Sequence, residues 1–260
     1  MSRTPADGRS EGLERWRGRV ALVTGASAGI GRAVAVRLAR AGLRVVGWGR
    51  QIEALEALAA ALADHDFAWR RVELRDVEAI RAAVAATVAS HGGVDVLVNG
   101  AGIGFDAPMV GGDPEAWREI LDVNVLALAL CTSLAVEDMR RRETEDTRAP
   151  GHVIHISSMS GHRVPRGNAM YAASKYAVRA MTEGLRGELR GLGSRIRVTA
   201  ISPGNVATGF AQRFLGDAFV PPPYPRLEAE DVADAVAHVL GAPDRVAYHD
   251  LLVRPAEQPT

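Results

Sequence analysis

The stretch RVALVTGASAGIGRAVAVRLARAG, residues 19–42, combines the features that decide the fold. A short apolar run at 19–24 is typical of a buried strand, and apolar residues recur at helical spacing from residue 29 onward. The glycine-rich turn between them lets the backbone approach a pyrophosphate, whose charge is favoured by the N-terminus of the following helix. A tight turn with a purely structural role is the alternative. The turn residues expected to contact phosphate are Gly25, Ser27, Gly29, Ile30 and Gly31.

The same alternation of apolar strands and longer helical segments continues along the whole chain. Near-continuous apolar strands separated by helices indicate a parallel sheet covered on both faces. The sequence therefore predicts one doubly wound α/β domain of the Rossmann type with a seven-stranded parallel sheet. We expect strands at 19–24, 44–49, 67–74, 94–100, 152–157, 195–202 and 248–254, and helices at 29–42, 52–64, 76–92, 114–141, 168–189 and 228–242.

Composition and charge argue against several classes of function. Of the 260 residues 47% are hydrophobic, and the net charge is +0, so no basic surface indicates a nucleic acid or an anionic membrane. The single cysteine, Cys131, excludes an intrachain disulfide and lies in an apolar helical run, where a buried, inert thiol is expected. With no apolar run of about 20 residues and no signal-peptide core, we expect a cytoplasmic protein without a transmembrane segment.

Three histidines that lie close together in the sequence raise the question of a metal site. Strand alternation places His152 and His155 on opposite faces, and no carboxylate joins them or His162 at ligand spacing. No metal is therefore expected, and His162 is instead predicted to line the mouth of a substrate site.

Two segments interrupt the alternation within a domain predicted to span 16–260, after a polar arm at 1–15. The mixed-charge run at 140–150 predicts a solvated connection, with binding of an acidic partner as the alternative. The segment 205–227 is too long for a tight connection. Because it follows the carboxyl end of a strand, where ligands collect in such sheets, we expect a flap that covers a substrate. Its PPPYP motif could instead serve as a polyproline ligand for a partner protein.

The predicted helix at 168–189 carries Tyr171 and Lys175 four residues apart, hence on one face. Lys175 is the only lysine among 31 basic residues, in a chain that otherwise uses arginine. A compact ammonium fits a tight site that rejects the planar guanidinium of arginine. The spacing thus favours a proton-transfer pair, because a nearby cation stabilises the phenolate. An amphipathic helix on which the two residues happen to align is the alternative.

The end of the second predicted strand indicates the type of dinucleotide. An acidic residue there accepts the ribose 2′-hydroxyl of NAD, whereas arginine suits the 2′-phosphate of NADP. The strand ends in Gly-Trp-Gly-Arg, with no carboxylate before Glu53, so Arg50 predicts NADP(H) as the cofactor. An ordinary surface arginine is the alternative in a chain this rich in arginine.

Taken together, these motifs resemble those of the short-chain dehydrogenase/reductase family over residues 16–260. That family has a TGxxxGxG turn, an NNAG motif, an Asn in the fourth helix, a Ser about thirteen residues before the Tyr of YxxxK, and a Pro-Gly after the sixth strand. The corresponding residues in this chain are TGASAGIG at 24–31, NGAG at 99–102, Asn124, Ser158, Tyr171 with Lys175, and Pro203-Gly204.

The resemblance implies a role for each of these residues. Tyr171 would act as general acid in reduction and as base in oxidation, while Lys175 would lower the pKa of Tyr171 and hold the nicotinamide ribose. Ser158 would stabilise the substrate oxygen, and Asn124 would link Lys175 to solvent through its backbone carbonyl and a water. Besides the phosphate turn and Arg50, the implied cofactor contacts are Glu73, Leu74, Asn99, Ala101, Gly102, Tyr171, Lys175, Pro203, Gly204, Val206 and Thr208, and the predicted substrate contacts are His162, Phe210 and Phe214.

The chain departs from the family pattern at three points. Gly100 stands where the family has a second Asn, so any side-chain contact there is lost. Glu73 stands where an Asp contacts adenine, and its extra methylene puts that contact in doubt. Ser157 and Ser158 are adjacent, and the thirteen-residue spacing selects Ser158.

The sequence thus predicts an NADP(H)-dependent oxidoreductase that transfers hydride to or from a carbonyl or secondary alcohol of a lipophilic small molecule. Members of the family to which the motifs look similar act on keto-steroids, which favours that class. An isoprenoid (farnesol-type) alcohol and a general carbonyl or diketone substrate are the alternatives. A protein of a different class, a non-catalytic NADP-binding sensor, is a further alternative. The resemblance also implies a homodimer or homotetramer.

Overall fold

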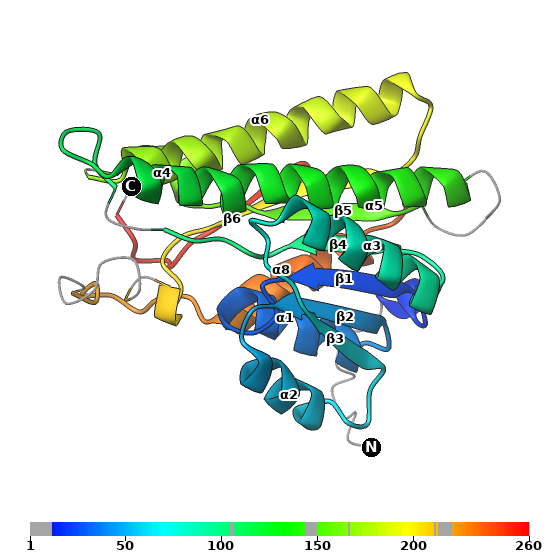
Figure 1. Ribbon diagram of the computed structural model, residues 1–260. Coiled ribbons are helices and arrows are strands. Elements are labelled where there is room, and N and C mark those ends of the chain that lie inside the picture. Colours follow the sequence, from blue (N-terminus) through cyan, green and yellow to red (C-terminus); the bar gives the residue numbers. More distant parts are fainter. Residues whose placement is uncertain are drawn as a thin grey trace, which may run out of the picture.

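In the part of the chain that the structure describes, seven strands form one sheet in the order β3-β2-β1-β4-β5-β6-β7 (Figure 1). This computed structural model describes residues 12–104, 107–143, 150–165, 167–210, 212 and 220–259. Every strand pairs in parallel with its neighbours, which confirms the predicted parallel sheet. The strands are β1 (Val20–Thr24), β2 (Arg44–Gly49), β3 (Phe67–Arg71), β4 (Val96–Asn99), β5 (His152–Ile156), β6 (Arg197–Pro203) and β7 (Asp250–Val253).

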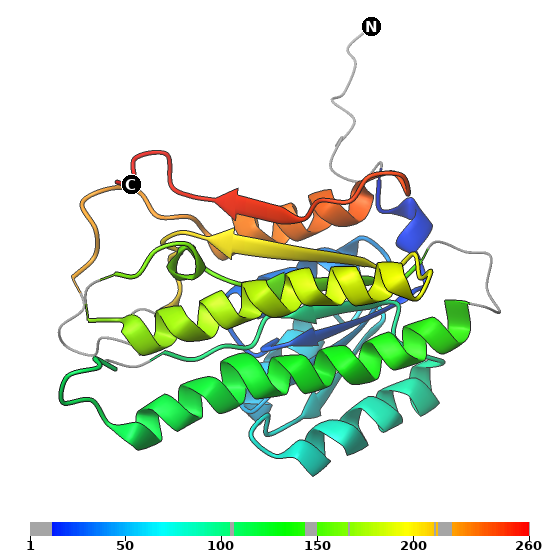
Figure 2. The same ribbon diagram turned by 90° about the horizontal axis from the view of Figure 1, so that it is seen from above.

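Helices cover both faces of the sheet, which confirms the doubly wound Rossmann-type fold (Figure 2). Strands β1, β2, β4, β5 and β6 contribute side chains to two apolar clusters, one on either face, because successive residues of a strand point to opposite sides. The first cluster contains α1 (Gly29–Arg40), α2 (Ile52–Ala61) and α8 (Ala229–Gly241), and the second contains α3 (Val77–His91), α5 (Leu128–Glu143) and α6 (Ala169–Gly191).

The strand order reverses between β1 and β4, and this point positions the functional site. The chain leaves β1 toward one face and β4 toward the other, so a crevice opens at the carboxyl ends of these two strands. The register pairs Thr24, the last residue of β1, with Asn99, the last residue of β4. Both residues belong to motifs that the sequence analysis singled out.

The start of the described chain packs onto the face that carries α1 and α8. Leu13 and Trp16 are buried there, and the Trp16 indole donates to the Leu240 carbonyl at the end of α8 (2.9 Å). The polar arm predicted at 1–15 remains a prediction, since residues 1–11 lie outside the described part of the chain.

The long predicted helix runs from α4 (Pro114–Leu121) through a π-helical turn (Asp122–Ala127) into α5. Cys131 lies on its buried side, as expected, and burial raises the pKa of this thiol to about 12. By length and composition alone the helix could cross a membrane, although polar residues interrupt its apolar sequence. Half of its apolar window is buried inside the domain, however, as in the core helix of a globular fold.

The prediction of a solvated connection at 140–150 is wrong for residues 140–143. Helix α5 continues to Glu143, and Arg142 turns inward to contact Asp95 (2.8 Å) and Asp138 (3.0 Å). Glu143 accepts hydrogen bonds from the Ser194 hydroxyl and the Arg195 amide, both beyond the end of α6. Because these charged side chains find partners within the fold, the run begins as part of the helix although its sequence is polar. Residues 144–149 lie outside the described chain.

Asp95 is the centre of this buried ion-pair network. It accepts from Arg19 (2.9 Å), Arg142 (2.8 Å) and the Val20 amide (2.8 Å), and its side chain is 8% exposed. Burial alone would raise the pKa of Asp95, but the hydrogen bonds and charges of the two arginines hold it below its usual value. The network thereby ties β1, β4 and α5 together at the end of the sheet away from the crevice.

Replacing Asp95 by Asn is expected to lower the free energy of unfolding by about 3 kcal/mol at pH 7, measured by urea denaturation, because Arg19 and Arg142 lose the carboxylate that they share. The lowered folded pKa means that this stabilisation is present above the unfolded pKa of about 3.9 and is lost as the pH falls through the folded value. Wild type and Asp95→Asn should therefore converge at low pH.

Arg118→Gln provides the control, because it breaks an exposed ion pair with Glu115 (2.7 Å). This change should cost less than about 1 kcal/mol. Equal losses for Asp95→Asn and Arg118→Gln would contradict the assignment of Asp95 as the buried centre.

Candidate active site

The turn between β1 and α1 has the geometry of a phosphate cradle. Gly25 adopts φ +76°, and a Cβ there would lie 2.9 Å from the Ala101 backbone. A Cβ on Gly31 would collide with the Gly25 carbonyl. Helix α1 begins after Ala28, whose side chain cannot cap it, and its first turn carries no acidic residue. The first backbone amides of α1 can therefore donate hydrogen bonds to an anion. The turn fits the pyrophosphate of a dinucleotide.

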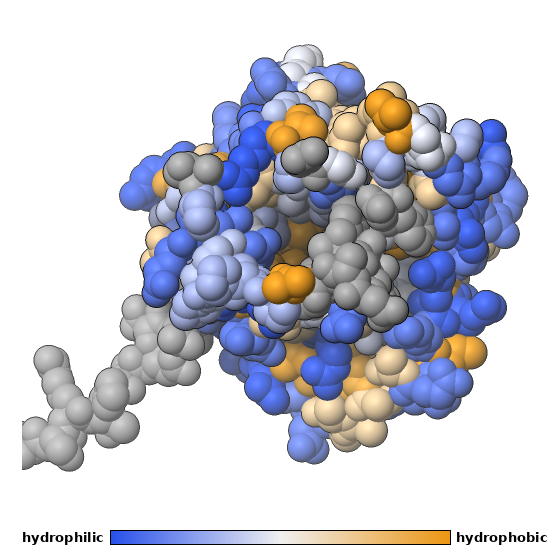
Figure 3. Space-filling view, turned by 90° about the vertical axis from the view of Figure 1, so that its left-hand side faces the viewer, coloured by the Kyte–Doolittle hydropathy of each residue, from blue (hydrophilic) through white to orange (hydrophobic). Residues whose placement is uncertain are grey.

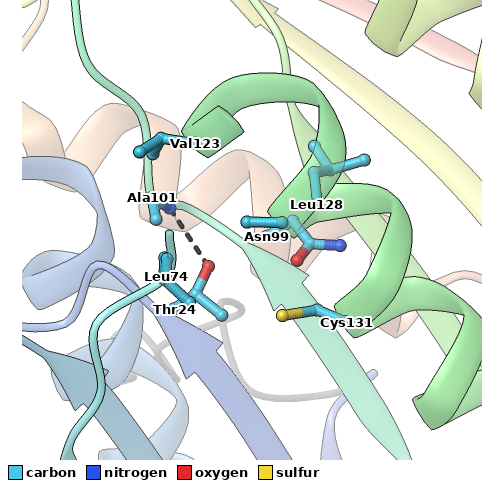
Figure 4. A pocket seen from close by; sticks show the side chains of 8 residues that line it. Thr24, Leu74, Asn99, Ala101, Val123, Leu128 and Cys131 are labelled. Atoms are coloured by element: carbon cyan, nitrogen blue, oxygen red, sulfur yellow. Dashed lines mark hydrogen bonds between the residues drawn. The ribbon is translucent and has the colours of Figure 1, made fainter. Parts of the chain in front are cut away.

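The floor of the crevice lies between the ends of β1 and β4. The Ala101 amide donates to the Thr24 hydroxyl (3.1 Å), and a small pocket opens beside this contact (Figure 4). Leu74 from the end of β3 and Cys131 from α5 also line it. Three residues predicted to contact the cofactor, Leu74, Asn99 and Ala101, therefore share one pocket.

A buried chain of hydrogen bonds fixes the Asn99 side chain at the wall of this pocket. Its amide donates to Thr132 on α5 (2.9 Å), Thr132 contacts His155 Nε2 (3.1 Å), and His155 Nδ1 contacts Thr182 on α6 (2.8 Å). The Thr182 hydroxyl itself donates to the Val178 carbonyl, so His155 Nδ1 must carry the proton and Nε2 must accept one. Burial lowers the pKa of His155 to about 3, which keeps the ring neutral in that form.

Ser158 and Tyr171 meet at the carboxyl end of β5. Ser158 caps a short 3-10 helix (Met159–Gly161) by accepting from the Ser160 amide (3.1 Å), and it is hydrogen-bonded to the Tyr171 side chain. Its neighbour Ser157 turns the other way, toward the Lys175 carbonyl (3.4 Å). The geometry thus supports Ser158, the serine selected from the spacing.

Lys175 lies beneath Tyr171 and is 4% exposed. Its Nζ donates to the Ile156 carbonyl (3.0 Å) and lies 5.7 Å from the centre of the Tyr171 ring. Burial lowers the pKa of Lys175 to about 8 and raises that of Tyr171 to about 12. The expected lowering of the Tyr171 pKa by Lys175 is absent from this structure. Burial of the phenol raises that pKa, and the hydrogen bond with Ser158 only partly offsets the effect of burial.

Asn124 is held in the π-helical turn by three hydrogen bonds from its side chain. The side chain accepts from the Ile103 amide (2.9 Å) and donates to the Ile103 carbonyl (2.9 Å) and to Ser174 (3.1 Å). Ser174 in turn donates to the Tyr171 carbonyl (2.7 Å). Because a π-turn widens the helix, it frees a backbone carbonyl, as in the role implied for Asn124. The side chain itself is fully used to join α6 to the strand end after β4.

A flap is predicted at 205–227, after β6, and residues 211 and 213–219 of this segment lie outside the described part of the chain. Its base is closed by a parallel bridge between Val206 and Leu227, and Thr208 reaches the phosphate turn, 3.3 Å from the position of a Cβ on Gly29. The Asn205 amide group donates to the Tyr224 hydroxyl (2.6 Å), so the PPPYP motif folds back onto this base. Pro203 ends β6, and Gly204 is covered by the Gln258 side chain.

The predicted substrate residues differ in where they lie. The Phe210 ring lies 5.8 Å from the Tyr171 ring and so forms part of the site. His162 Nε2 is 2.9 Å from the Ser202 hydroxyl on β6, so the ring braces two strand ends and is half-buried. Phe214 lies outside the described residues.

The mouth of the site opens at the carboxyl edge of the sheet. Figure 3 looks onto this side of the molecule and shows a hollow with apolar residues in its depth and at its rim. The loops after β4, β5 and β6 expose Met109, Val110, Val164 and Val220. This surface suits a substrate with substantial apolar area.

The adenosine end of the crevice is polar. Arg50 follows β2 and Glu73 follows β3, and their side chains approach to 3.9 Å. The Glu73 carboxylate is turned toward Arg75, which contacts both of its oxygens (3.1 Å and 3.2 Å). Among the described residues, no group of three or more His, Cys, Asp or Glu side chains could hold a metal ion.

Several residues of the site escape sequence reasoning. Ser174 lies inside the YAASK motif and could have been found there. Thr132, His155 and Thr182 come from three separate elements, and nothing in the sequence joins them. Gln258, whose side chain accepts from the Asn205 amide (3.1 Å), lies about 50 residues away from its partner.

Comparisons with known proteins agree with this geometry. The short chain dehydrogenase family matches residues 19–217. Dehydrogenase/reductase SDR family member 11 of Gallus gallus is 43% identical, covering 95% of this chain and 99% of that protein. Farnesol dehydrogenase of Aedes aegypti is 43% identical, covering 94% and 98%. The closed form of serine dehydrogenase complexed with NADP+ superposes with a TM-score of 0.85 at 31% identity, covering 93% of this chain and 96% of that one.

Fold, site and relatives together define a Rossmann-type oxidoreductase that acts on CH–OH donors with a nicotinamide cofactor. The chain belongs to the short-chain dehydrogenase/reductase family, as the resemblance predicted.

The two adjacent serines offer a matched test of the site. Ser158→Ala is expected to lower kcat by about 10²–10³, because it removes the hydroxyl that is hydrogen-bonded to Tyr171 and that the resemblance assigns to the substrate oxygen. Ser157→Ala removes a hydroxyl that faces the helix backbone, so kcat should stay within about threefold and stability should fall by about 1 kcal/mol. Steady-state kinetics and urea unfolding of both variants decide the matter, and a larger loss of kcat in Ser157→Ala would reverse the assignment.

Proposed function

We propose that the protein is an NADP(H)-dependent reductase or dehydrogenase for a carbonyl or secondary alcohol of a lipophilic small molecule, with keto-steroid-like substrates favoured. The observation that carries this proposal is the buried cluster of Ser158, Tyr171 and Lys175, with Phe210 above it. A binding-only protein has no use for a phenol held over a desolvated ammonium, which argues against the sensor.

Tyr171 is the proposed acid and base. A substrate carbonyl oxygen placed against the phenol would receive its proton in reduction, and the phenolate would recover that proton in oxidation. Ser158, hydrogen-bonded to the same phenol, would donate to the substrate oxygen and stabilise its developing charge. A bound nicotinamide dinucleotide supplies the hydride in one direction and accepts it in the other.

Lys175 is the proposed source of positive charge beneath the phenol. Its burial leaves the charge poorly screened, so it would oppose, without reversing, the effect of burial that raises the pKa of Tyr171. The backbone at Asn124 would pass protons between Lys175 and solvent. Gly102 leaves room for this route, since a Cβ there would lie 3.4 Å from Asn124 Oδ1 and 3.5 Å from Lys175 Nζ.

The preference for NADP(H) rests on Arg50. Its side chain is half-exposed at the end of β2, where a ribose 2′-phosphate belongs in this fold. Serine dehydrogenase, a structural relative, is complexed with NADP+. No acidic residue precedes Glu53 at this strand end to select a free 2′-hydroxyl.

The choice of substrate rests on apolar surface and on the relatives. Phe210 and the exposed rim around the mouth support a lipophilic molecule. Farnesol dehydrogenase among the relatives supports an isoprenoid alcohol as the second candidate, followed by a general carbonyl or diketone substrate.

We also propose a cytoplasmic homodimer or homotetramer. Leu121 and Leu126 on the long helix and Tyr176 on α6 are exposed apolar residues, which supports pairing through these helices.

The decisive experiment measures oxidation of NADPH and NADH against keto-steroids, isoprenoid aldehydes, diketones and quinones. We expect the highest kcat/KM with NADPH and a keto-steroid. Tyr171→Phe should lower kcat at least about 10³-fold, as loss of a general acid does, while the Kd for NADPH stays within about threefold. Equal or better rates with NADH would contradict the proposal that Arg50 selects NADP(H). No turnover across the panel, despite NADPH binding, would leave the sensor as the function.

A further inference from the structure

A carboxylate lies beside the residue proposed to bind the 2′-phosphate. Glu73 Oε2 is 3.9 Å from Arg50, and the Glu73 side chain is 33% exposed. A phosphate held by Arg50 would therefore lie close to a like charge, which disfavours its binding. A 2′-phosphate bound there would therefore need a group that offsets the charge of Glu73.

Arg75 resolves this conflict by its contacts with Glu73. Its Nε and Nη2 donate to the two Glu73 oxygens (3.1 Å and 3.2 Å), and its backbone amide donates to the first oxygen as well (3.2 Å). This forked, charge-assisted arrangement fixes the direction of the carboxylate. The hydrogen bond from Arg75 is also the largest cause that holds the pKa of Glu73 below its usual value.

The position of Arg75 is itself fixed from a second element. Its Nη1 donates to Glu119 on α4 (3.2 Å), and Asp122 at the start of the π-turn adds to the negative field around it. Three carboxylates therefore face one guanidinium, and Arg50 is the second cation beside Glu73. Removing Arg75 would leave the carboxylate of Glu73 free to pair with Arg50.

We propose that Arg75 is a specificity-determining residue: by clamping Glu73 it keeps Arg50 available to the 2′-phosphate and neutralises the charge that would repel it. This inference rests on the proposed preference for NADP(H). Arg75 acts through Glu73 and needs no contact with the cofactor.

The test measures binding of two cofactor fragments, which separates the 2′-phosphate from catalysis. Isothermal calorimetry gives the Kd of adenosine 2′,5′-bisphosphate and of adenosine 5′-monophosphate for wild type, Arg75→Ala, Glu73→Gln and the double variant. Arg75→Ala should lower the preference for the bisphosphate about tenfold, an effect that shrinks between about 0.05 and 0.5 M salt because exposed charges are screened. The double variant should return to within about threefold of wild type, since the repelling charge is gone.

Arg81→Ala is the matched control, because Arg81 pairs with Glu78 on α3 (3.7 Å) and its loss removes the same charge without freeing Glu73. Glu119→Gln removes the link to α4 but keeps the contacts between Arg75 and Glu73, so it should lower the preference less than Arg75→Ala does. An unchanged preference for the bisphosphate in Arg75→Ala would overturn the role of Arg75 but not the proposed NADP(H) preference. A double variant as impaired as Arg75→Ala would do the same. A wild type without preference for the bisphosphate would overturn the proposed NADP(H) preference, and the Arg75 assignment with it.

Discussion

Burying an ammonium beneath a phenol is the constraint on which the rest of this structure depends. Lys175 and Tyr171 are 4% and 8% exposed, and removing charged groups from water is costly unless the surroundings replace it. The Ile156 carbonyl supplies one partner for the ammonium, and Ser158 supplies one for the phenol. Helix α6 keeps the two side chains a turn apart, and β5 brings Ile156 and Ser158 to its carboxyl end. The pair is thus held by two elements whose relative position the sheet fixes.

The parallel sheet also explains why the crevice has two ends of opposite character. The ends of β1, β2 and β3 present the glycine-rich turn, Arg50 and Glu73, which are polar and charged. Beside the ends of β5 and β6 lie Tyr171 on α6 and Phe210 after β6, close to the exposed apolar loops. A molecule that spans β1 and β4 therefore meets charges at one end and apolar surface at the other. A charged dinucleotide and a lipophilic substrate fit this division.

Much of the fold and the central part of the site could be predicted from sequence, because both depend on local patterns. Apolar runs and glycine positions predict β1 and α1, and the four-residue spacing predicts the shared face of Tyr171 and Lys175. Contacts between distant elements could not be predicted in the same way. The mixed charges around Arg142 resemble a solvated loop until Asp95 is brought beside them by the sheet. The effect of Lys175 on the pKa of Tyr171 was likewise inferred from spacing alone, whereas burial decides the direction in the structure.

The most direct test of the buried ammonium uses the fact that Lys175 is the only lysine in the chain. Protein labelled with 13C at the lysine ε-carbon gives a single side-chain resonance, which can be followed by NMR from pH 6 to pH 11 without assignment. Burial of the ammonium predicts a midpoint at about 8 in the free protein. A midpoint of about 10.4, the value for a lysine in water, would contradict the account, because it would mean that burial does not disfavour the Lys175 ammonium.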